Sequence, residues 1–534
     1  MTSEVEVESV PDPGRTMEGL RDTGYDFETA IADLVDNSIA ANASVVDILI
    51  VQDFRGAIRV SIADNGEGMD SKELVDAMRY GSPKRPDPAS LGKYGLGLKT
   101  ASTAYCRRLS VISRKSSDPK CQMATWDLDH VMSAQKWILL LSEIADAEAM
   151  EQLNRVSPNG SGTVVVWTKV DRLLGNYQEP GGKHAQKALA KKVAELQQHL
   201  SETYQRFLDK NDRRAQNVVI RVNEQKVRPW DPFQAGLSEL VAAETILTKT
   251  GSGGDAEFDV KAFILPRREE FESDQQAKAA KLSSDRQGIY IYRQNRLIHK
   301  ADWLGMFQKE PHGTLLRVEF SFDHRLDEAF HLDIKKSKII LNDDLWVWLK
   351  DQFLPAPRRE ANRRYREGQK KDITRKSKNA HSASNRNIQN KEAEVGGAKV
   401  DTADPETGAV TISNTRGQFK IKLPVGPATT PGEVFVQSVN EVADGLLFEP
   451  AIIDRHKAVR INVDHPYYRK VYVPNMKSSV TIQGMDSLLW ALSVAELSAT
   501  TDQTAENFSD MRFEMSRILR KLVESLPEPV LDLD

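Results

Sequence analysis

One strongly basic stretch constrains how this chain can be organised. Between Arg358 and Lys391 stand 12 Lys and Arg residues against three Asp and Glu residues, a local charge of +9. The whole chain has a net charge of -4, so the rest of it carries -13. Because Asn, Ser and Gln fill much of the stretch and apolar residues are few, its composition is typical of a disordered linker. The stretch therefore divides the chain in two.

The patterns on either side of this stretch predict three folded domains of α+β class. A chain of 534 residues is several times the length of a typical domain of about 150 residues, so more than one core is expected. Strand and helix patterns alternate in residues 15–182, and a long helical pattern precedes strands in residues 183–354. After the linker, residues 355–400, short strands and two apolar helices predict a small α/β domain in residues 401–534.

Several classes of protein are excluded by composition. Cys106 and Cys121 are too few for a disulfide framework and lack the paired spacing of a zinc site. The chain has no run of about 18 apolar residues, and its N-terminus is acidic where a signal peptide is basic. We expect a soluble cytoplasmic protein without a membrane partner, associated with the nucleoid if it binds DNA.

A carboxylate and an amide are predicted to share one helix face near the N-terminus. Asp33 and Asn37 lie in the helical pattern AIADLVDNSIAANA. At 100° per residue their side chains project about 40° apart. Asn37 is suited to bind Mg²⁺ beside nucleotide phosphates, and Asp33 is suited to orient and deprotonate a water molecule. Taken alone, the pattern is more typical of a polar surface helix.

Two glycine-rich segments follow. Asp64 ends a strand pattern and is followed by Gly66, Gly68 and Met69, so its carboxylate can accept a hydrogen bond from the exocyclic amine of adenine. A plain Gly-rich turn is the alternative. The second segment precedes a helical pattern, where backbone amides and the helix dipole favour phosphate. Its candidate phosphate-binding residues are Gly92, Lys93, Gly95, Leu96, Gly97 and Lys99. The spacing fits neither a Walker loop nor a dinucleotide fingerprint.

In order and spacing, DLVDN, DNGEG and GKYGLG resemble the motifs of the GHKL ATPase superfamily, which includes gyrase, the ninety-kilodalton heat-shock chaperone, histidine kinases and MutL. Gly160-Ser-Gly162-Thr163 is similar to the fourth motif. The resemblance implies a GHKL (Bergerat) α/β sandwich over residues 15–182, with Thr163 supporting the base. It also implies ATP and Mg²⁺ as cofactors, Asn37 as the metal ligand, and a mobile lid at about residues 70–98.

One position departs from the family pattern. The hydrolysing families carry Glu where this chain has Asp33, which is one methylene shorter. The resemblance therefore implies an ATPase, converting ATP and water to ADP and phosphate, that is slow.

The second domain resembles the transducer of microrchidia (MORC)-like and MutL-like members, a fold similar to domain 2 of ribosomal protein S5. The resemblance covers roughly residues 15–350 and implies that Lys338, or its neighbours Lys335 and Lys336, senses the γ-phosphate. A solvated charge run is the alternative for these lysines. The first histidine, His130, comes too late for a histidine kinase.

The resemblance implies a clamp that closes by ATP-gated homodimerisation and acts on DNA. The basic residues 358–391 are the candidate contact to double-stranded DNA, without sequence specificity because Tyr365 is almost the only aromatic residue among them. Two alternatives stay open: an ATP-binding switch with little hydrolysis that serves as an interaction module, and a chaperone-like machine acting on protein clients.

Overall fold

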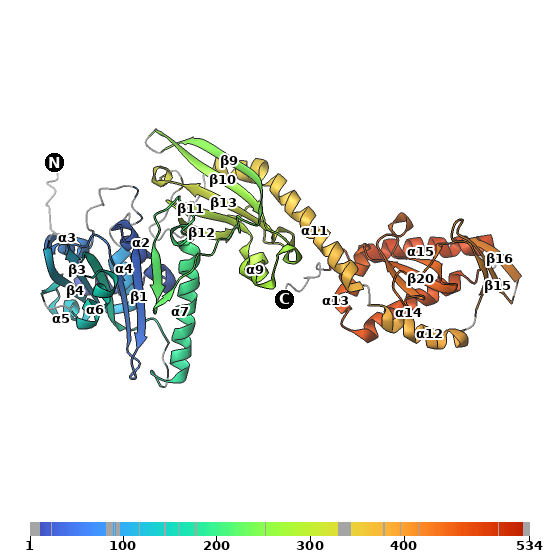
Figure 1. The fold of residues 1–534 in the computed structure, drawn as a ribbon, viewed down its shortest axis with the longest axis horizontal. Helices are drawn as coiled ribbons and strands as arrows, with labels where there is room; N and C mark the ends of the chain where they lie inside the picture. Colours follow the sequence, from blue (N-terminus) through green and yellow to red (C-terminus); the bar gives the residue numbers. More distant parts are fainter. Residues whose placement is uncertain are drawn as a thin grey trace, which may run out of the picture. The chain divides into compact units, whose positions relative to one another are not determined.

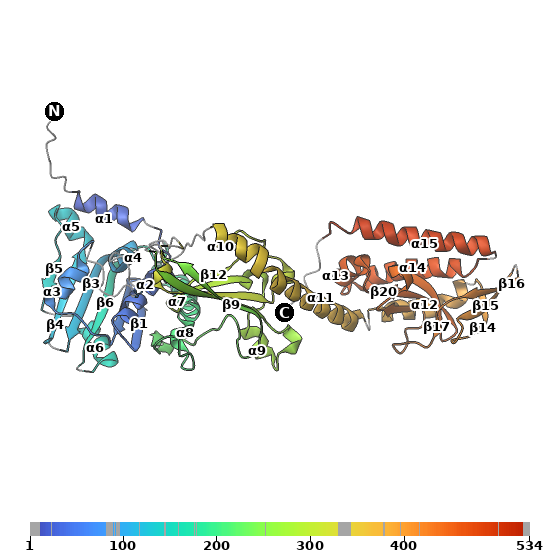
Figure 2. The same ribbon diagram turned by 90° about the horizontal axis from the view of Figure 1, so that it is seen from above.

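The computed structural model of the chain contains two compact units, Met1–Ala361 and Asn362–Asp534, which are drawn in Figures 1 and 2. The residues that the structure describes are 11–22, 24–81, 89, 91, 97–116, 118–143, 146–158, 160–175, 177, 179–250, 253–328, 330, 343–377, 380–395, 397–415, 417–499 and 501–526. Mixed helix and sheet in both units confirm the predicted α+β class.

The first sheet of the N-terminal unit has the strand order β5-β4-β3-β6-β2-β1-β7-β8 among the described residues. Its neighbours pair antiparallel, except that β1 and β7 are parallel. The strands are β1 (Val45–Gln52), β2 (Ile58–Asp64), β3 (Cys106–Lys115), β4 (Asp118–Asp127), β5 (Leu140–Ser142), β6 (Gly162–Val170), β7 (Val219–Val222) and β8 (Gln225–Lys226). Because β7 and β8 belong to this sheet, it extends beyond residue 182, where the sequence patterns place the domain boundary.

Helices cover both faces of this sheet. They are α1 (Pro13–Arg21), α2 (Phe27–Ala40), α3 (Ser71–Met78), α4 (Gly97–Tyr105), α5 (Leu128–Ala134), α6 (Ala147–Val156), α7 (Lys183–Thr203) and α8 (Gln205–Leu208). Ile31 and Leu34, one turn apart on α2, share a core with Ile48 of β1 and Ala101 of α4. On the opposite face, Leu153 of α6 belongs to a separate apolar cluster. Helix α6 therefore packs on the face of the sheet opposite to α2 and α4.

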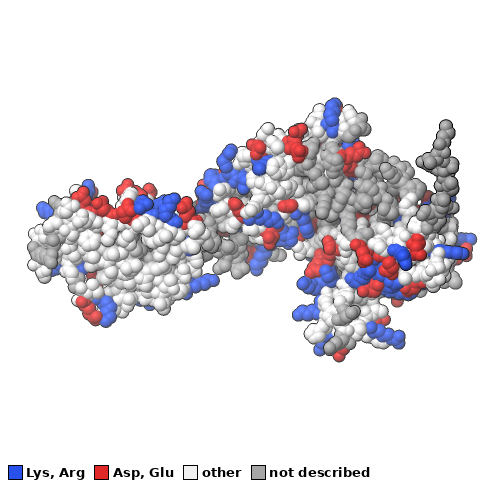
Figure 3. Space-filling model, turned by 180° about the vertical axis from the view of Figure 1, so that it is seen from behind, with Lys and Arg blue, Asp and Glu red and all other residues white. Residues whose placement is uncertain are grey.

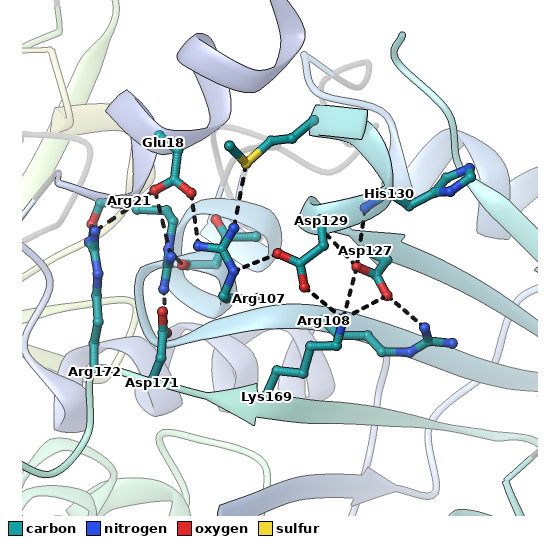
Figure 4. Close-up of polar contacts among 12 residues, drawn as sticks. Glu18, Arg21, Arg107, Arg108, Asp127, Asp129, His130, Lys169, Asp171 and Arg172 are labelled. Carbon is teal, nitrogen blue, oxygen red and sulfur yellow. Dashed lines mark hydrogen bonds and ion pairs between the residues drawn. The ribbon is translucent and has the colours of Figure 1, made fainter. Parts of the chain in front are cut away.

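An ion-pair network anchors α1 to α4 and β3 (Figure 4). Arg21 is buried, pairs with Asp171, and donates a hydrogen bond from Nε to the backbone oxygen of Thr103 in α4 at 2.8 Å. Glu18 pairs with Arg107 of β3 at 2.9 Å. Because a buried guanidinium without partners is strongly unfavourable, these contacts specify where α1 lies. They hold the C-terminal half of the helix that begins at Gly97.

The second sheet of this unit has the order β12-β11-β13-β10-β9 in the described chain and is antiparallel except for the β11–β13 pair. Its core is rich in Phe; the ring centroids of Phe322 and Phe330 lie 4.8 Å apart. The elements are β9 (Glu239–Lys249), β10 (Asp255–Ile264), β11 (Gly288–Arg293), β12 (Arg296–Asp302), β13 (Leu316–Phe322), α9 (Asp274–Ala279), α10 (Asp343–Trp348) and the π-helical turn Leu349–Phe353. Short 3-10 turns lie at Arg268–Glu270, Ser284–Arg286, Pro311–Gly313 and His324–Leu326.

Helix α7 joins the two sheets of the N-terminal unit. It packs against α2 of the first layer and against β12 of the second sheet, and Figure 1 shows it running between them. Helix α7, which lies between β6 and β7 in the chain, is therefore also a physical connection between the two sheets.

The structure differs from the expected disordered linker. Most of residues 355–400 are helical, in α11 (Pro355–Ser377) and α12 (Ser382–Val395). Arg, Lys, Glu, Gln and Ala are good helix formers, and Arg363 pairs with Glu367 one turn later. Ala361 belongs to the core of the second sheet, and Ile388 belongs to the core of the C-terminal unit. Burial at these positions supplies the stability that a composition-based prediction overlooks.

The C-terminal unit contains two small sheets among the described residues, with orders β14-β15-β16 and β17-β19-β20-β18. Within the unit, His381 and Asp486 of α14 are fully buried and bonded, Nδ1 to Oδ2, at 2.8 Å. The elements are β14 (Lys399–Ala403), β15 (Ala409–Asn414), β16 (Gly417–Lys422), β17 (Val425–Gly426), β18 (Val436–Val439), the 3-10 turn Ala443–Gly445, β19 (Phe448–Ile453), β20 (His456–Asn462), the π-helical turn Tyr468–Tyr472, α13 (Val473–Asn475), α14 (Ser479–Glu496) and α15 (Asp502–Leu522). Across the described part of the chain, no helix is both long and apolar enough to span a bilayer.

The turn after β2 is held against neighbouring backbone. Gly68 has a φ of +69°, and a Cβ built on it would lie 1.9 Å from the backbone oxygen of Arg114 in β3. A Cβ on Gly66 would lie 2.7 Å from the backbone oxygen of Ala41. These glycines therefore have a packing role that is separate from any contact with a nucleotide.

We expect Gly68→Ala to destabilise the N-terminal unit by about 3 kcal/mol or more, because left-handed strain costs about 1–2 kcal/mol and overpacking about 1–3 kcal/mol. Gly81→Ala is the matched control: Gly81 has a φ of +74° but no neighbouring atom within 4 Å of its Cβ position. It should lose only the strain, about 1–2 kcal/mol. Urea denaturation of both variants measures the difference. Equal losses would show that the contact with Arg114 is unimportant.

Candidate functional site

Asp33 and Asn37 lie one turn apart in α2. Asp33 is only 7% exposed, and its Oδ2 accepts a hydrogen bond from the hydroxyl of Tyr25 at 3.1 Å. Asn37 is partly exposed. One face of the helix thus presents a buried, oriented carboxylate beside a more accessible amide. Tyr25, which precedes the helix, was not predicted from the sequence, because it belongs to none of the recognised motifs.

Asp64 ends β2, opposite Thr163 of β6. One carboxylate oxygen accepts a hydrogen bond from Ser38 Oγ at 2.8 Å, and the other accepts one from the backbone N–H of Gly66 at 2.9 Å. Burial raises the pKa of this carboxyl above its ordinary value, and hydrogen bonds from Gly66, Ser38 and Thr163 oppose the rise without cancelling it. Each carboxylate oxygen has two lone pairs, so a further donor can still be accepted.

A hydroxyl pair connects the second and fourth motifs. Ser113 of β3 accepts a hydrogen bond from the backbone N–H of Met69 at 2.8 Å, and its Oγ lies 2.9 Å from Oγ1 of Thr163. Sequence reasoning identified Met69 and Thr163 but missed Ser113 and Ser38. A Ser in a strand or helix is common, and the only available signal for Ser38 was its position directly after Asn37.

Helix α4 begins at Gly97, close to Asp33. A Cβ on Gly97 would lie 3.3 Å from Oδ2 of Asp33, so a side chain here would occupy the space beside that carboxylate. The first amides of a helix and its dipole attract anions such as phosphate. The structure thus places a potential anion-binding helix terminus next to the candidate base.

Lys99 lies inside the protein in this structure. It is 1% exposed, and its ammonium donates a hydrogen bond to the backbone oxygen of Ala77, in the last turn of α3, at 2.9 Å. Burial lowers its pKa to about 8. The carboxyl end of a helix favours a cation, so this contact links α4 to α3.

Several predicted site residues lie outside the described residues: Gly92, Lys93, Gly95, Leu96 and Lys338, together with Lys335 and Lys336. Much of the predicted lid, residues 70–98, lies outside them too, whereas α3 within it is described. The phosphate loop and the γ-phosphate sensor therefore stay predictions.

The donor set of the described residues suits Mg²⁺ shared with a nucleotide. No group of three or more His, Cys, Asp and Glu side chains in the described part of the chain could hold a metal by itself. Mg²⁺ is commonly bound by one or two protein groups together with substrate phosphates and water. Asn37 offers an amide oxygen for such a site, one turn from Asp33.

The buried ammonium of Lys99 predicts a pH-dependent stability difference. The pKa of Lys99 is about 8 in the folded protein and 10.5 in its ordinary state. Between these two pH values the unfolded chain binds more protons than the folded chain, so the contribution of Lys99 to stability rises with pH over this window. At pH 7 the burial cost is complete. We expect Lys99→Met to be more stable than wild type at pH 7 by about 1–3 kcal/mol, with the gap closing toward pH 10.5.

Urea denaturation at a series of pH values measures this gap. Lys72→Met is the control, because Lys72 is exposed at the start of α3. If both variants show the same pH dependence relative to wild type, burial of Lys99 is not the cause.

Comparison with known proteins identifies the region around this site. Residues 25–163 match the family described as histidine kinase-, DNA gyrase B-, and HSP90-like ATPase. Over 96 residues the chain is 32% identical to ATPase MORC2B of Mus musculus and 33% identical to ATPase MORC2 of Homo sapiens. Each alignment covers 17% of this chain and 9% of the relative. The chain is also 37% identical over 94 residues to the DNA mismatch repair protein MutL of Azorhizobium caulinodans, covering 17% of this chain and 15% of that protein.

Solved structures show only a distant overall likeness. A crystal structure of the N-terminal domain of a DNA repair protein aligns over 67% of this chain and 98% of its own, with 18% identity and a TM-score of 0.38. The ATPase and transducer domains of DNA topoisomerase II from Balamuthia mandrillaris align over 64% of this chain and 86% of theirs, with 9% identity and a TM-score of 0.33.

The family match spans the segment that holds Asp33, Asn37, Asp64, Gly97 and Thr163, and the MORC and MutL similarities agree with the resemblance seen in the motifs. The chain therefore carries, in residues 25–163, an ATPase domain of the GHKL type, with MORC-like sequence similarity.

Proposed function

We propose that this protein is a Mg²⁺-dependent, MORC-like ATPase that slowly converts ATP and water to ADP and phosphate. The observation that supports the proposal is that α2 lies beside two groups suited to different parts of ATP, the carboxylate of Asp64 and the N-terminus of α4. Ser38 of α2 holds Asp64, and Asp33 of the same helix lies beside the first residue of α4. One helix thus connects a carboxylate suited to adenine with a helix terminus suited to phosphate.

Each residue has a separate role in this proposal. Asp64 accepts a hydrogen bond from the exocyclic amine of adenine, and Thr163 supports the base. Asn37 provides an oxygen ligand to Mg²⁺, which when bound neutralises charge on the phosphates. The amides at Gly97 bind phosphate oxygens, and Asp33 accepts the proton of the attacking water.

A slow reaction follows from the reach of Asp33. Its carboxylate is one methylene shorter than that of Glu, and the hydrogen bond from Tyr25 engages one of its oxygens. The same observation favours a second candidate function, an ATP-binding switch with little turnover. In either case ATP can close a homodimer only through its difference in affinity for the open and closed states.

Removal of the proposed base tests the ATPase. We expect Asp33→Asn to lower kcat about 10²- to 10⁴-fold, the usual contribution of general base catalysis, while ATP binding is retained. Asn37→Ala should weaken Mg·ATP binding itself. Steady-state phosphate release and equilibrium ATP binding on the same samples measure both effects.

One outcome would contradict the ATPase proposal. Wild-type turnover no higher than that of Asp33→Asn, with ATP bound by both, would favour the switch. Asp33→Glu tests the reason given for the slow reaction: turnover should rise if the short reach of Asp33 limits it.

The proposed partner of the clamp is double-stranded DNA, contacted through residues 358–391. Exposed arginines 359, 363 and 366 lie on α11, which is a helix rather than a flexible tether. In contrast, Figure 3 shows a broad face of the C-terminal unit with few charged side chains and a mixed band of acidic and basic groups along one edge. That face offers no continuous basic surface for phosphates.

The salt dependence of binding tests this contact. If six cationic side chains neutralise DNA phosphates, the log-log slope of affinity against salt concentration is about -5. Replacing three of these side chains with uncharged ones should bring the slope to about -2.7. We expect the triple variant Arg359→Gln, Arg363→Gln, Arg366→Gln to show this reduction in fluorescence anisotropy titrations with duplex DNA.

The matched control removes three exposed lysines from α7, as Lys183→Gln, Lys187→Gln, Lys191→Gln. It changes net charge equally and should leave the slope near that of wild type. If both triple variants reduce the slope equally, only overall charge matters and α11 is not the contact.

A further inference from the structure

A buried arginine from the second sheet reaches the helix that carries the candidate base. Arg296 is the first residue of β12 and is 4% exposed. Its Nε donates a hydrogen bond to Oδ1 of Asp36 at 2.7 Å, and its Nη2 lies 4.0 Å from Oδ1 of Asp33. Arg296 and Asp36 are 260 positions apart in the chain. One guanidinium therefore lies within ion-pair distance of two carboxylates of α2, those of Asp36 and Asp33.

A second donor completes the environment of Asp36. The hydroxyl of Tyr204, at the end of α7, donates to Oδ1 of Asp36 at 2.7 Å and lies 2.6 Å from the backbone oxygen of Ala32. The guanidinium of Arg296 lies 5.9 Å from the centre of the Tyr204 ring. Asp36 is thus held by two side chains from later in the chain: Tyr204, directly after α7, and Arg296, in the second sheet.

The charges show how strongly this contact is specified. Burial disfavours a charged Arg296, yet Asp36, Tyr204 and Asp33 together outweigh burial and raise the pKa of the guanidinium. Two carboxylates separated by less than one helical turn repel each other unless a cation lies between them. If β12 withdrew, both would lose that cation.

The two oxygens of Asp33 face different partners. Oδ2 accepts the hydrogen bond of Tyr25, whereas Oδ1 is the oxygen nearest to Arg296. Tyr25 comes from the segment before α2, and Arg296 comes from the second sheet. The orientation of this carboxylate therefore depends on contacts from both parts of the N-terminal unit.

We propose that Arg296 is a positioning residue for hydrolysis: it holds Asp36, draws Oδ1 of Asp33 into place, and makes the base competent only while the second sheet is docked on α2. This inference rests on the proposed ATPase function. It assigns the coupling of the two sheets to a contact that is present in the described residues, independently of the lysines near Lys338.

The test compares two buried arginines of the same hairpin. Arg293, the last residue of β11, is 1% exposed and pairs with Asp327 at 2.7 and 2.8 Å, entirely within the second domain. Arg293→Gln therefore removes an equally buried ion pair without touching α2. Wild type, Arg296→Gln, Arg296→Lys, Arg293→Gln and Asp33→Asn are assayed together for kcat, KM, ATP affinity and thermal unfolding.

We expect Arg296→Gln to lower kcat about tenfold or more while KM and ATP affinity change less than about threefold, because a positioning group acts on the transition state rather than on ground-state binding. Arg296→Lys keeps the charge and should recover part of kcat. It also keeps the test valid if Arg296→Gln does not fold. Arg293→Gln should lower thermal stability but retain kcat per folded molecule.

The outcomes separate this inference from the proposed function. If wild-type turnover does not exceed that of Asp33→Asn, hydrolysis itself fails and the inference falls with it. If Asp33→Asn abolishes turnover but Arg296→Gln retains it, only the inference is overturned. An equal loss of kcat in Arg293→Gln, or a loss in Arg296→Lys as large as in Arg296→Gln, would reduce Arg296 to a general structural role and also overturn it.

Discussion

The hydrogen bonds of the buried Asp36 carboxylate hold the two sheets of the N-terminal unit together. This carboxylate accepts hydrogen bonds from Tyr204, the residue directly after α7, and from Arg296 of β12. Breaking a buried ion pair by removing one partner costs about 3–5 kcal/mol, because the remaining charge is left in a poor solvent. Helix α2 can therefore keep its polar side buried only where these two donors reach it. Asp33, Asn37 and Ser38 share that helix, so the site geometry depends on the same contact.

Several motif residues serve the fold as well as the site. Gly68 lets the backbone after β2 approach Arg114, and Lys99 donates to the carbonyl end of α3. Ser113 joins the Met69 turn to Thr163. A residue in a nucleotide-binding motif thus need not contact nucleotide, and its substitution changes stability as well as binding. Stability and binding therefore have to be measured separately at such positions.

The parts of the site that depend on local order were predictable. The helical period placed Asp33 and Asn37 one turn apart, and the strand pattern ended at Asp64, where β2 ends. Contacts between distant segments were not predictable, since nothing near Ser38 or Ser113 in the sequence indicates a partner. For the basic residues 358–391 the predicted disorder was wrong, because composition describes an isolated segment. It does not register that Ala361 and Ile388 are buried by other elements.

The local elements and the chemistry they carry can be read from the amino-acid order: the α2 helix with its carboxylates, the strand that ends at Asp64, and the ATPase family that residues 25–163 match. Which elements share these groups follows from the folded chain. Folding brings Arg296 to Asp36 across 260 positions and buries residues of α11 and α12 that composition alone assigns to a linker. The physical reason is that helical and strand periods are set by neighbours in sequence, whereas burial and ion pairing are set by neighbours in space.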